Sequence, residues 1–449
     1  MRILLAANAS YVPPRGGATR SNLAWLEHLT GEGHECRVVA ASLAANSSGK
    51  DQQLRDEEIG VLEKRLYSSG DVTAVRWRGM DVYSTPDPIR QRQLLREQIR
   101  EFSPDWVLVS SEDLGHILLR EAHESAPGRV VYLAHTPQFF PFGPASWNPD
   151  PDAARLVAQS AAVVTIGQHS AYYVRQHAGC RAEVVHPPIY GDGPFPLYAR
   201  FDDGLVTMIN PCLVKGITIF LDLAKACPEF EFGAVPGWGT TKADRKALAE
   251  LPNVELLPNV RRIEQVLERT RVLLMPSLWY EGFGLIAMEA MLHGIPVISS
   301  DSGGLLEAKM GTRFVIRVNG IERYEPVFDE HGMPRPVVPE NPVGPWVSAL
   351  RSLLADRNLY EHESATSRRG ALWFVGSLQS GRMEEFLSTL LALRSPQPET
   401  EPAGMTSGAQ EGPHRAIEHL SPDKRALLLQ RLRRRALQAE NPPSQTSSS

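Results

Sequence analysis

Short apolar runs alternate with amphipathic segments along the first 190 residues. Such runs, bounded by polar or turn-forming residues, are typical of buried strands, whereas apolar positions three or four apart indicate helices. Strands are predicted at 3–7, 36–41, 106–109, 130–134, 162–166 and 184–185, and helices at 21–30, 89–102, 114–124 and 172–178. This alternation predicts βαβ units and a parallel sheet covered by helices on both faces.

A dense cluster of prolines and glycines at 187–196 interrupts the pattern and is interpreted as an inter-domain linker. The alternation then restarts, with strands predicted at 205–209, 230–234, 254–256, 272–275 and 296–299, and helices at 216–227, 241–249, 263–269 and 285–292. The predicted fold is therefore α/β, with two Rossmann-like domains that face a cleft, the first over 1–190 and the second over 191–375.

The remainder of the chain is less regular. Residues 319–345 carry many prolines and little periodicity, so a long loop of the second domain is predicted there. Helices are predicted at 346–354 and 383–393, and the segment 376–394 is expected to return to the N-terminal domain. From 395 the composition is rich in Pro, Glu, Gly and Ser, which predicts a mostly disordered tail.

Composition narrows the class of protein. A length of 449 residues suggests two or three domains, and a formal charge of -5 argues against a nucleic acid partner. The four cysteines show no metal-type or redox-type spacing, which indicates thiols in a reducing compartment. The first apolar run is too short for a signal peptide, and none approaches the roughly 18 residues that span a bilayer. We expect a cytoplasmic protein without a transmembrane segment.

The most informative stretch contains two glutamates eight positions apart, Glu281 and Glu289. Between them, Gly282-Phe283-Gly284 forms a turn that enters a predicted helix at Leu285. Glycines let the backbone approach a ligand, a helix N-terminus favours a phosphate, and carboxylates accept sugar hydroxyls. The pattern indicates a nucleotide-sugar site; a two-carboxylate hydrolase is the alternative, but the turn is of the phosphate-binding type.

Other candidate residues follow predicted strands. Lys215, beside Gly216 at a helix start, points to a phosphate, although a solvated lysine by a helix cap gives the same pattern. A second glycine-rich turn, 302–304, leads to Glu307. Gly16 and Gly17 lie at the first strand-to-helix turn, where an ordinary βα loop also needs glycine.

His135 follows the strand at 130–134, at the carboxyl end that lines ligand sites in α/β folds. Several aromatic residues follow the same strand ends. They form either an acceptor platform or loop packing, and the pattern does not separate these two roles; the residues are Tyr11, Phe139, Phe140 and Trp147.

The chain resembles the retaining glycosyltransferases of family 4, also described as glycosyl transferases group 1, which have the GT-B fold. The specific match is the Glu281-x7-Glu289 block with 276–284 around it and 294–297 after it. Lys215-Gly216, the 302–307 turn and the Gly16-Gly17 pair occur in the expected order. The resemblance covers about residues 1–395.

The resemblance implies a role for each matched residue. Glu281 would contact the transferred sugar and Glu289 the ribose hydroxyls of the nucleotide. His135 would lie near the sugar, and Gly16 and Gly17 would line the cleft. The diphosphate would be held by a set of side-chain and backbone donors, namely Lys215 and the amides of Phe283, Gly284 and Leu285. The resemblance thus implies Glu281, Lys215 and His135 as the catalytic set.

One position departs from the family pattern. The family commonly has an arginine five residues before the lysine, where this chain has Asn210. One charge contact to phosphate is therefore lost, replaced by a neutral hydrogen bond, or supplied by another cation, for which Arg15 is a candidate.

The implied reaction moves a sugar from a UDP- or GDP-sugar to a small-molecule or lipid acceptor with retention of anomeric configuration. It requires neither a metal nor a cofactor, because positioning and stabilisation of the leaving diphosphate supply the catalysis. Two alternatives stay open: a non-catalytic GT-B scaffold, which only Asn210 favours, and a nucleotide-sugar epimerase.

A basic amphipathic helix is predicted within the tail, at 420–438. Ser421 suits the N-cap, Pro422 the first helical position, and Asp423 the positive end of the helix dipole. Four arginines lie in the last turns. A solvated helix and a membrane-surface contact are both open. The segment 420–428 is also similar to segments that flank condensation domains in polyketide and nonribosomal peptide assembly lines. That similarity suggests docking to such a protein and a natural product or assembly-line intermediate as acceptor.

Overall fold

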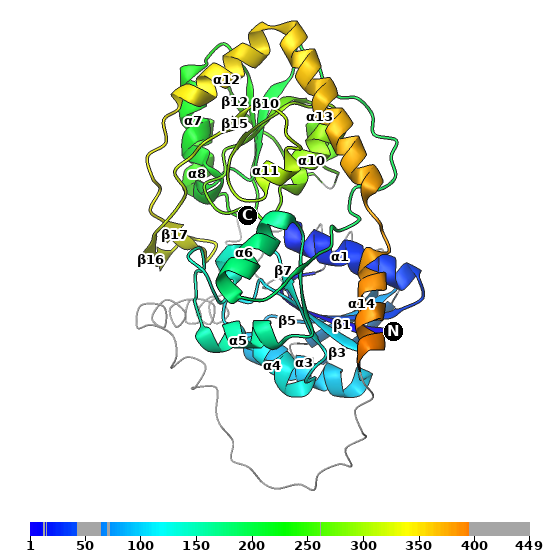
Figure 1. The fold of residues 1–449 in the computed structure, drawn as a ribbon. Helices are drawn as coiled ribbons and strands as arrows, with labels where there is room; N and C mark the ends of the chain where they lie inside the picture. Colours follow the sequence, from blue (N-terminus) through cyan, green and yellow to red (C-terminus); the bar gives the residue numbers. More distant parts are fainter. Residues whose placement is uncertain (12–13, 15, 43–63, 70–71, 261, 395–449) are drawn as a thin grey trace, which may run out of the picture.

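The computed structural model describes residues 1–11, 14, 16–42, 64–69, 72–260 and 262–394. The chain forms two α/β domains stacked one above the other (Figure 1). This arrangement confirms the predicted fold class. The tail helix predicted at 420–438 lies outside the described residues.

The N-terminal domain is built on a nine-stranded sheet within the described ranges, in the order β3-β4-β5-β2-β1-β6-β7-β8-β9. From β5 to β9 the neighbours in this order are parallel, and β3 and β4 add an antiparallel edge. The strands are β1 (Arg2–Ser10), β2 (Glu35–Ala41), β3 (Lys64–Ser69), β4 (Val72–Trp77), β5 (Met80–Thr85), β6 (Trp106–Ser110), β7 (Val130–Ala134), β8 (Ala162–Thr165) and β9 (Glu183–Val184).

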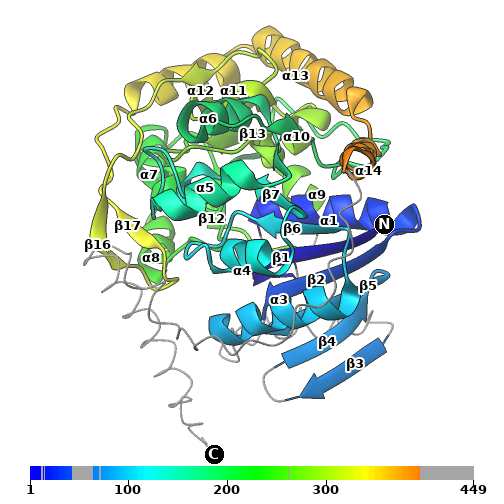
Figure 2. The ribbon, with the colours of Figure 1, turned by 60° about the horizontal axis from the view of Figure 1, so that its bottom comes forward.

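Helices cover both faces of this sheet (Figure 2). The central strand β1 shows why: Ile3 and Leu5 pack in one hydrophobic cluster with Trp25 of α1, whereas Leu4 packs in the other cluster with Leu94 of α3. The helices of the domain are α1 (Gly16–Gly31), α3 (Pro88–Phe102), α4 (Ile117–Ser125), α5 (Pro151–Gln159) and α6 (Gln168–Ala178), with the 3-10 turn η1 (Pro137–Phe139).

The C-terminal domain contains a six-stranded sheet, all parallel in its described part, in the order β12-β11-β10-β13-β14-β15. Its strands are β10 (Leu205–Ile209), β11 (Phe232–Val235), β12 (Val254–Leu256), β13 (Thr270–Met275), β14 (Val297–Ser300) and β15 (Val315–Ile316). Its helical segments are η2 (Leu213–Lys215), α7 (Ile217–Ala226), α8 (Lys242–Ala249), α9 (Glu264–Leu267), α10 (Leu285–Leu292), α11 (Leu305–Ala308), α12 (Gly344–Ala355) and α13 (Arg357–Ser377).

The last described helix, α14 (Arg382–Leu393), lies beside α1 (Figures 1 and 2). The indole of Trp106 in β6 donates a hydrogen bond to the Leu387 carbonyl at 3.1 Å, and His34 lies 2.9 Å from Glu384. The chain thus crosses between the domains twice, once after β9 and once between α13 and α14.

Several local predictions were wrong or incomplete. Residues 319–345 are not simply a loop, because β16 (Tyr324–Phe328) and β17 (Pro334–Pro336) pair antiparallel there. Helix α1 begins at Gly16, five residues before the predicted start at Ser21. The antiparallel edge β3–β5 and the helices α5, α11 and α13 were not predicted.

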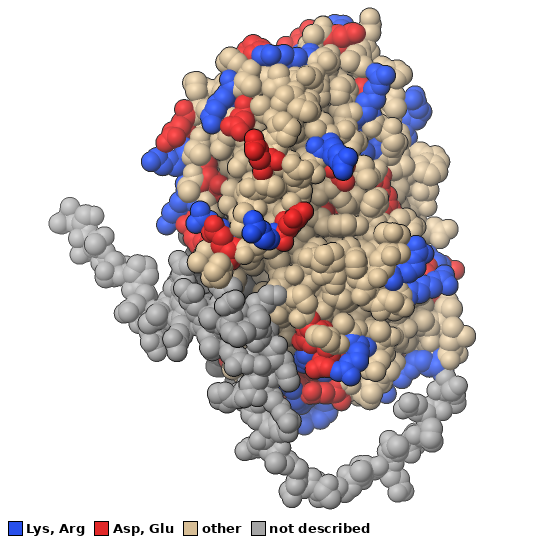
Figure 3. Space-filling view, turned by 60° about the vertical axis from the view of Figure 1, so that its left-hand side comes forward, with Lys and Arg blue, Asp and Glu red and all other residues tan. Residues whose placement is uncertain are grey.

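Two further observations concern the described helices and one face of the surface. Among the described helices, none is long and apolar enough to cross a membrane. On the face shown in Figure 3, Lys and Arg side chains are interspersed with Asp and Glu and do not gather into a basic patch.

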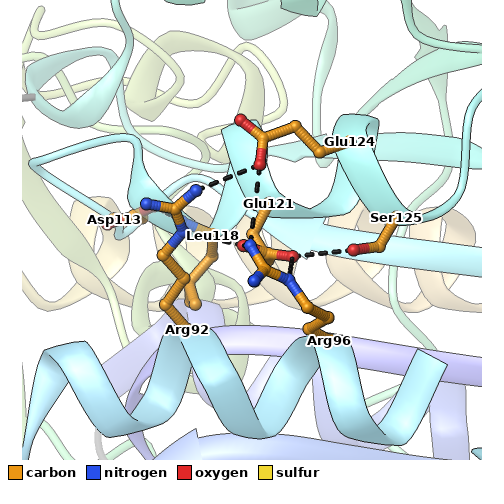
Figure 4. Close-up of polar contacts among 7 residues, drawn as sticks. All are labelled: Arg92, Arg96, Asp113, Leu118, Glu121, Glu124 and Ser125. Carbon is orange, nitrogen blue, oxygen red and sulfur yellow. Dashed lines mark hydrogen bonds and ion pairs between the residues drawn. The ribbon is translucent and has the colours of Figure 1, made fainter. Parts of the chain in front are cut away.

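A buried carboxylate links α3 to α4 (Figure 4). The side chain of Glu121 is fully buried and accepts hydrogen bonds from Arg92 at 2.7 Å, from Arg96 at 2.7 Å and from Ser125 at 2.7 Å. Burial opposes ionisation, but the hydrogen bonds from Arg96, Ser125 and Arg92 outweigh it and lower the pKa of Glu121.

Replacing Glu121 by Gln should destabilise the N-terminal domain by about 1–3 kcal/mol at pH 7, since the two arginines lose a charged acceptor. Because the folded pKa is lowered, the contribution of Glu121 is complete above the ordinary carboxyl pKa and is lost as the pH falls through the folded value. The difference from wild type in urea unfolding should therefore shrink in acid. Glu124→Gln is the matched control, because Glu124 contacts Arg92 at 3.0 Å but is 57% exposed; an equal loss in both variants would contradict the assignment.

Candidate active site

Helix α10 begins at the turn that the sequence marked. Its cap residue, Gly284, has a φ of 109°, and a Cβ there would lie 2.6 Å from a side-chain carbon of Leu305. Only glycine fits this conformation and this space. No side chain caps the helix, so the amides of Leu285 and Ile286 at its start are left for a ligand, whereas the Ala287 amide donates to the Gly284 carbonyl at 3.0 Å.

Helix α1 of the other domain begins beside α10. It starts at Gly16, whose φ is 81°, and a Cβ on Gly17 would lie only 3.3 Å from the side chain of Leu285. Two helix N-termini from different domains therefore meet at one place. Each carries a partial positive charge, so together they favour an anion between them.

Lys215 and Glu281 lie together although they are 66 positions apart. The ammonium of Lys215 donates to the carboxylate of Glu281 at 2.5 Å, and it lies 4.2 Å from the centre of the Trp279 ring. Ser277 donates to the same carboxylate oxygen at 2.5 Å. The tight turn before α7 sets this position, because a Cβ on Gly216 would overlap the carbonyl of Pro276.

Glu289 contacts a residue that the sequence analysis missed. Its Oε1 accepts from the guanidinium of Arg20 in α1 at 2.5 Å, and its buried Oε2 has no partner among the described residues. Glu289 raises the pKa of Arg20. The hydroxyl of Tyr190, also without a described partner, is close enough that Glu289 adds to the effect of burial in raising the pKa of Tyr190. The sequence did contain one indication of this contact, because Arg20 lies one turn into the helix that begins at Gly16.

His135 is completely enclosed, at 1% exposure. Its Nε2 lies 2.8 Å from the side-chain oxygen of Asn22, its ring stacks on Trp25, and its Nδ1 has no partner among the described residues. Burial lowers the pKa of His135, which keeps the imidazole neutral near pH 7. Its backbone carbonyl faces Gly282, where a Cβ would overlap it.

Asn210 does not act as a simple substitute for an arginine. It has a left-handed φ of 56°, and its side-chain oxygen accepts from the amide of Gly239 at 2.9 Å. The buried amide nitrogen Nδ2 has no described partner and is left as a neutral donor. The proposed substitute, Arg15, lies outside the described residues.

The four candidate aromatic residues divide into two groups. Tyr11 and Phe140 are buried in the two clusters on either side of the N-terminal sheet. Phe139 and Trp147 instead belong to a small cluster that spans the domains. That cluster continues from Trp147 to Trp279 at 6.1 Å and to Tyr324 of β16 at 5.5 Å.

A further contact joins the domains behind the α10 turn. The carboxylate of Glu307 accepts from the backbone amide of Gln168 at 2.7 Å, at the start of α6. Burial raises the pKa of Glu307. A cavity of about 510 Å³ adjoins this contact, with His186 and Trp373 in its lining.

Metal-ligating residues do not gather in the described parts of the chain, where no group of three His, Cys, Asp or Glu side chains could hold an ion. The sequence contains one Asp-x-Asp triplet, a pattern that can bind a metal ion, at Asp150-Pro151-Asp152. Its first carboxylate is engaged in contacts within the fold. Asp150 caps α5 through the amides of Asp152 and Ala153 and forms an ion pair with Arg120 at 2.5 Å.

Comparison with known proteins identifies the family. Residues 15–190 match the family model described as Glycosyltransferase Family 4, and residues 212–324 match the one described as Glycosyl transferases group 1. No curated protein matches the chain.

Solved structures show the same architecture at low sequence identity. HepE from Anabaena, solved with UDP and glucose, aligns with a TM-score of 0.59 and 15% identity over 87% of this chain and 100% of its own. Sucrose-phosphate synthase from Thermosynechococcus elongatus aligns with a TM-score of 0.63 and 14% identity, over 87% of this chain and 99% of its own. AviGT4, a glycosyltransferase involved in avilamycin A biosynthesis, aligns with a TM-score of 0.50 and 16% identity, over 87% of this chain and 98% of its own.

Two Rossmann-like domains that face each other give the chain the GT-B fold, which the solved structures share. The two family matches occur in the order of the two domains and together span more than half of the chain. The chain therefore belongs to the glycosyl transferases of group 1 and family 4.

Replacing Gly282 by Ala should push the domains apart, because the new Cβ overlaps the His135 carbonyl. We expect a loss of about 1–3 kcal/mol in unfolding free energy, measured by calorimetry, and a larger radius of gyration in X-ray scattering. Gly376→Ala is the control: it lies in α13 with open space around it and should be neutral or stabilising by up to about 1 kcal/mol. Equal behaviour of the two variants would show that the close approach at Gly282 is not required.

Proposed function

We propose that the protein transfers a sugar from a nucleoside-diphosphate sugar to an acceptor with retention of anomeric configuration and without a metal ion. The observation that carries this proposal is the meeting of the α1 and α10 N-termini beside the Lys215–Glu281 pair. Two helix ends and an ammonium suit a diphosphate, and the adjacent carboxylates suit hydroxyl groups of the sugar and the ribose.

In this proposal the diphosphate binds against the first turn of α10, where it accepts from the amides of Phe283, Gly284 and Leu285. Gly16 and Gly17 leave room for it from the other domain. Lys215 neutralises the charge that develops on the departing phosphate. The Glu281 contact holds the ammonium in place before the donor arrives.

We assign the sugar to the space between Glu281 and His135, as the family resemblance implies. The imidazole of His135 is neutral, and its buried Nδ1, which has no partner among the described residues, would bond a sugar hydroxyl if the ring becomes accessible when the donor binds. The sugar–phosphate bond breaks through an oxocarbenium-like state, the acceptor attacks from the face that the phosphate leaves, and the phosphate oxygen takes the acceptor proton. No protein base is required, so positioning and charge stabilisation supply the rate.

The acceptor and the setting are further parts of the proposal. A small-molecule or lipid acceptor would enter beside Trp147 and Phe139, and a natural product or assembly-line intermediate is the acceptor class that the tail sequence suggests. The free thiols of the cysteines fit the proposed cytoplasmic location. The enzyme would use no cofactor, and its donor substrate would be a UDP- or GDP-sugar.

A thermal-shift screen with UDP, GDP, UDP-glucose and GDP-mannose tests donor binding, since a ligand that binds the folded state raises the melting temperature. UDP is the first probe because the HepE structures contain it. Turnover in EDTA, and NMR of the product's anomeric proton, then test metal independence and retention. An isomerised donor would instead indicate an epimerase, and failure of every nucleotide to bind would indicate a scaffold.

Lys215→Ala should lower kcat by roughly 10²-fold or more, because it removes a charge that stabilises the leaving group. The measurement is nucleotide release in the presence of acceptor at saturating donor. Lys225→Ala is the matched control, since Lys225 lies on α7 at the surface and contacts only Asp222 at 3.3 Å. Unchanged turnover in Lys215→Ala would remove Lys215 from the catalytic set.

A further inference from the structure

An ion pair between the two domains occupies the carboxylate to which the ribose was assigned. Arg20 of α1 donates to Glu289 of α10 at 2.5 Å, across 269 positions of sequence. The side chain of Glu289 is 9% exposed, whereas that of Arg20 is 41% exposed. A buried carboxylate without a cation would be costly, so Arg20 stabilises Glu289 while no nucleotide is bound.

The position of this pair on α10 matters. Glu289 follows Leu285 by four residues, so both lie on one face of the helix, about 6 Å apart along its axis. Side chains of a helix tilt toward its N-terminus, which directs the Glu289 carboxylate toward the first turn. The guanidinium on that carboxylate therefore lies within one side-chain length of the helix start, where the diphosphate is expected.

Polar groups beside the Arg20–Glu289 pair lack hydrogen-bond partners among the described residues. Glu289 has a buried oxygen, Oε2, that no described group contacts, and the hydroxyl of Tyr190 beside it is also unpartnered. Asn210, the residue at which the family resemblance implies an arginine, is neutral, and its side-chain oxygen accepts from the Gly239 amide. Asn210 therefore brings no positive charge to the C-terminal side of the site, whereas Arg20 lies on the N-terminal side.

We propose that Arg20 exchanges partners when the donor binds, releasing Glu289 to the ribose hydroxyls and taking the diphosphate oxygens instead. Arg20 then supplies from the N-terminal domain the charge that Asn210 does not. This inference rests on the proposed function, because it assigns a binding residue within the same site.

The exchange predicts that Arg20 has opposite effects on the affinity for the nucleoside and on the affinity for the nucleoside diphosphate. A ligand with a ribose but no phosphate must break the Arg20–Glu289 pair and gains nothing in return. A ligand with a diphosphate breaks the same pair and gains a bidentate guanidinium contact. Arg20 should therefore oppose or leave unchanged the binding of uridine and favour the binding of UDP.

The test is calorimetric titration of uridine, UMP and UDP into wild type, Arg20→Ala, Arg20→Lys and Arg78→Ala. In Arg20→Ala we expect UDP affinity to fall roughly 10- to 100-fold while uridine affinity stays constant or rises, with Arg20→Lys intermediate. Arg78→Ala is the matched control, because Arg78 forms an ion pair with Glu27, which lies on α1 as Arg20 does. Its replacement should leave all three affinities unchanged.

Equal weakening of uridine and UDP in Arg20→Ala, or no change in either, would overturn the exchange. Arg20→Gln, which keeps most of the side-chain volume, gives the same comparison should Arg20→Ala fail to fold. A wild-type protein that binds none of the three ligands, nor the guanosine series, would contradict the proposed function itself and is thus a separate outcome.

Discussion

The meeting of two helix N-termini is the constraint on which the rest of the structure depends. Helices α1 and α10 come from different domains, and Gly17 and Leu285 are almost in contact. Two positive helix ends repel each other unless negative charge lies between them. Glu281 and Glu289 belong to the same region of the chain, but each is already paired with a cation, Lys215 and Arg20 respectively. The two helix ends therefore keep their partial positive charge, which favours an anion such as a diphosphate at this interface.

The hydrophobic packing keeps these helix ends in place. One cluster runs without interruption from β1 and α1 of the first domain through α10 to α13 and α14. Six of the eight residues of α10 are buried, so the helix cannot rotate to relieve the charges at its start. Polar contacts add direction at the same interface: Ser170 donates to the Gly282 carbonyl at 3.1 Å, and Tyr280 donates to that of His169 at 3.2 Å.

Prediction from sequence succeeded where the local pattern was strong and failed where it was weak. The bounds of β7, β10, β12 and α10 agree with the structure, since each is a mostly apolar segment bounded by polar or turn-forming residues. Helix α13 was missed because its buried face includes Glu363, Ser364 and Ser367 and shows little apolar periodicity. The β16–β17 hairpin was missed because prolines at its strands usually mark loops.

The sequence by itself determined the two α/β domains, the glycine-marked helix starts and the chemical types at Lys215, Glu281 and Glu289. These features follow from residues within a few positions of one another, which periodicity and turn chemistry can show. Only the tertiary structure decided that Arg20 pairs with Glu289 and that burial keeps His135 neutral. Those facts depend on how two domains dock, and a contact across 269 positions leaves no local pattern in a single sequence.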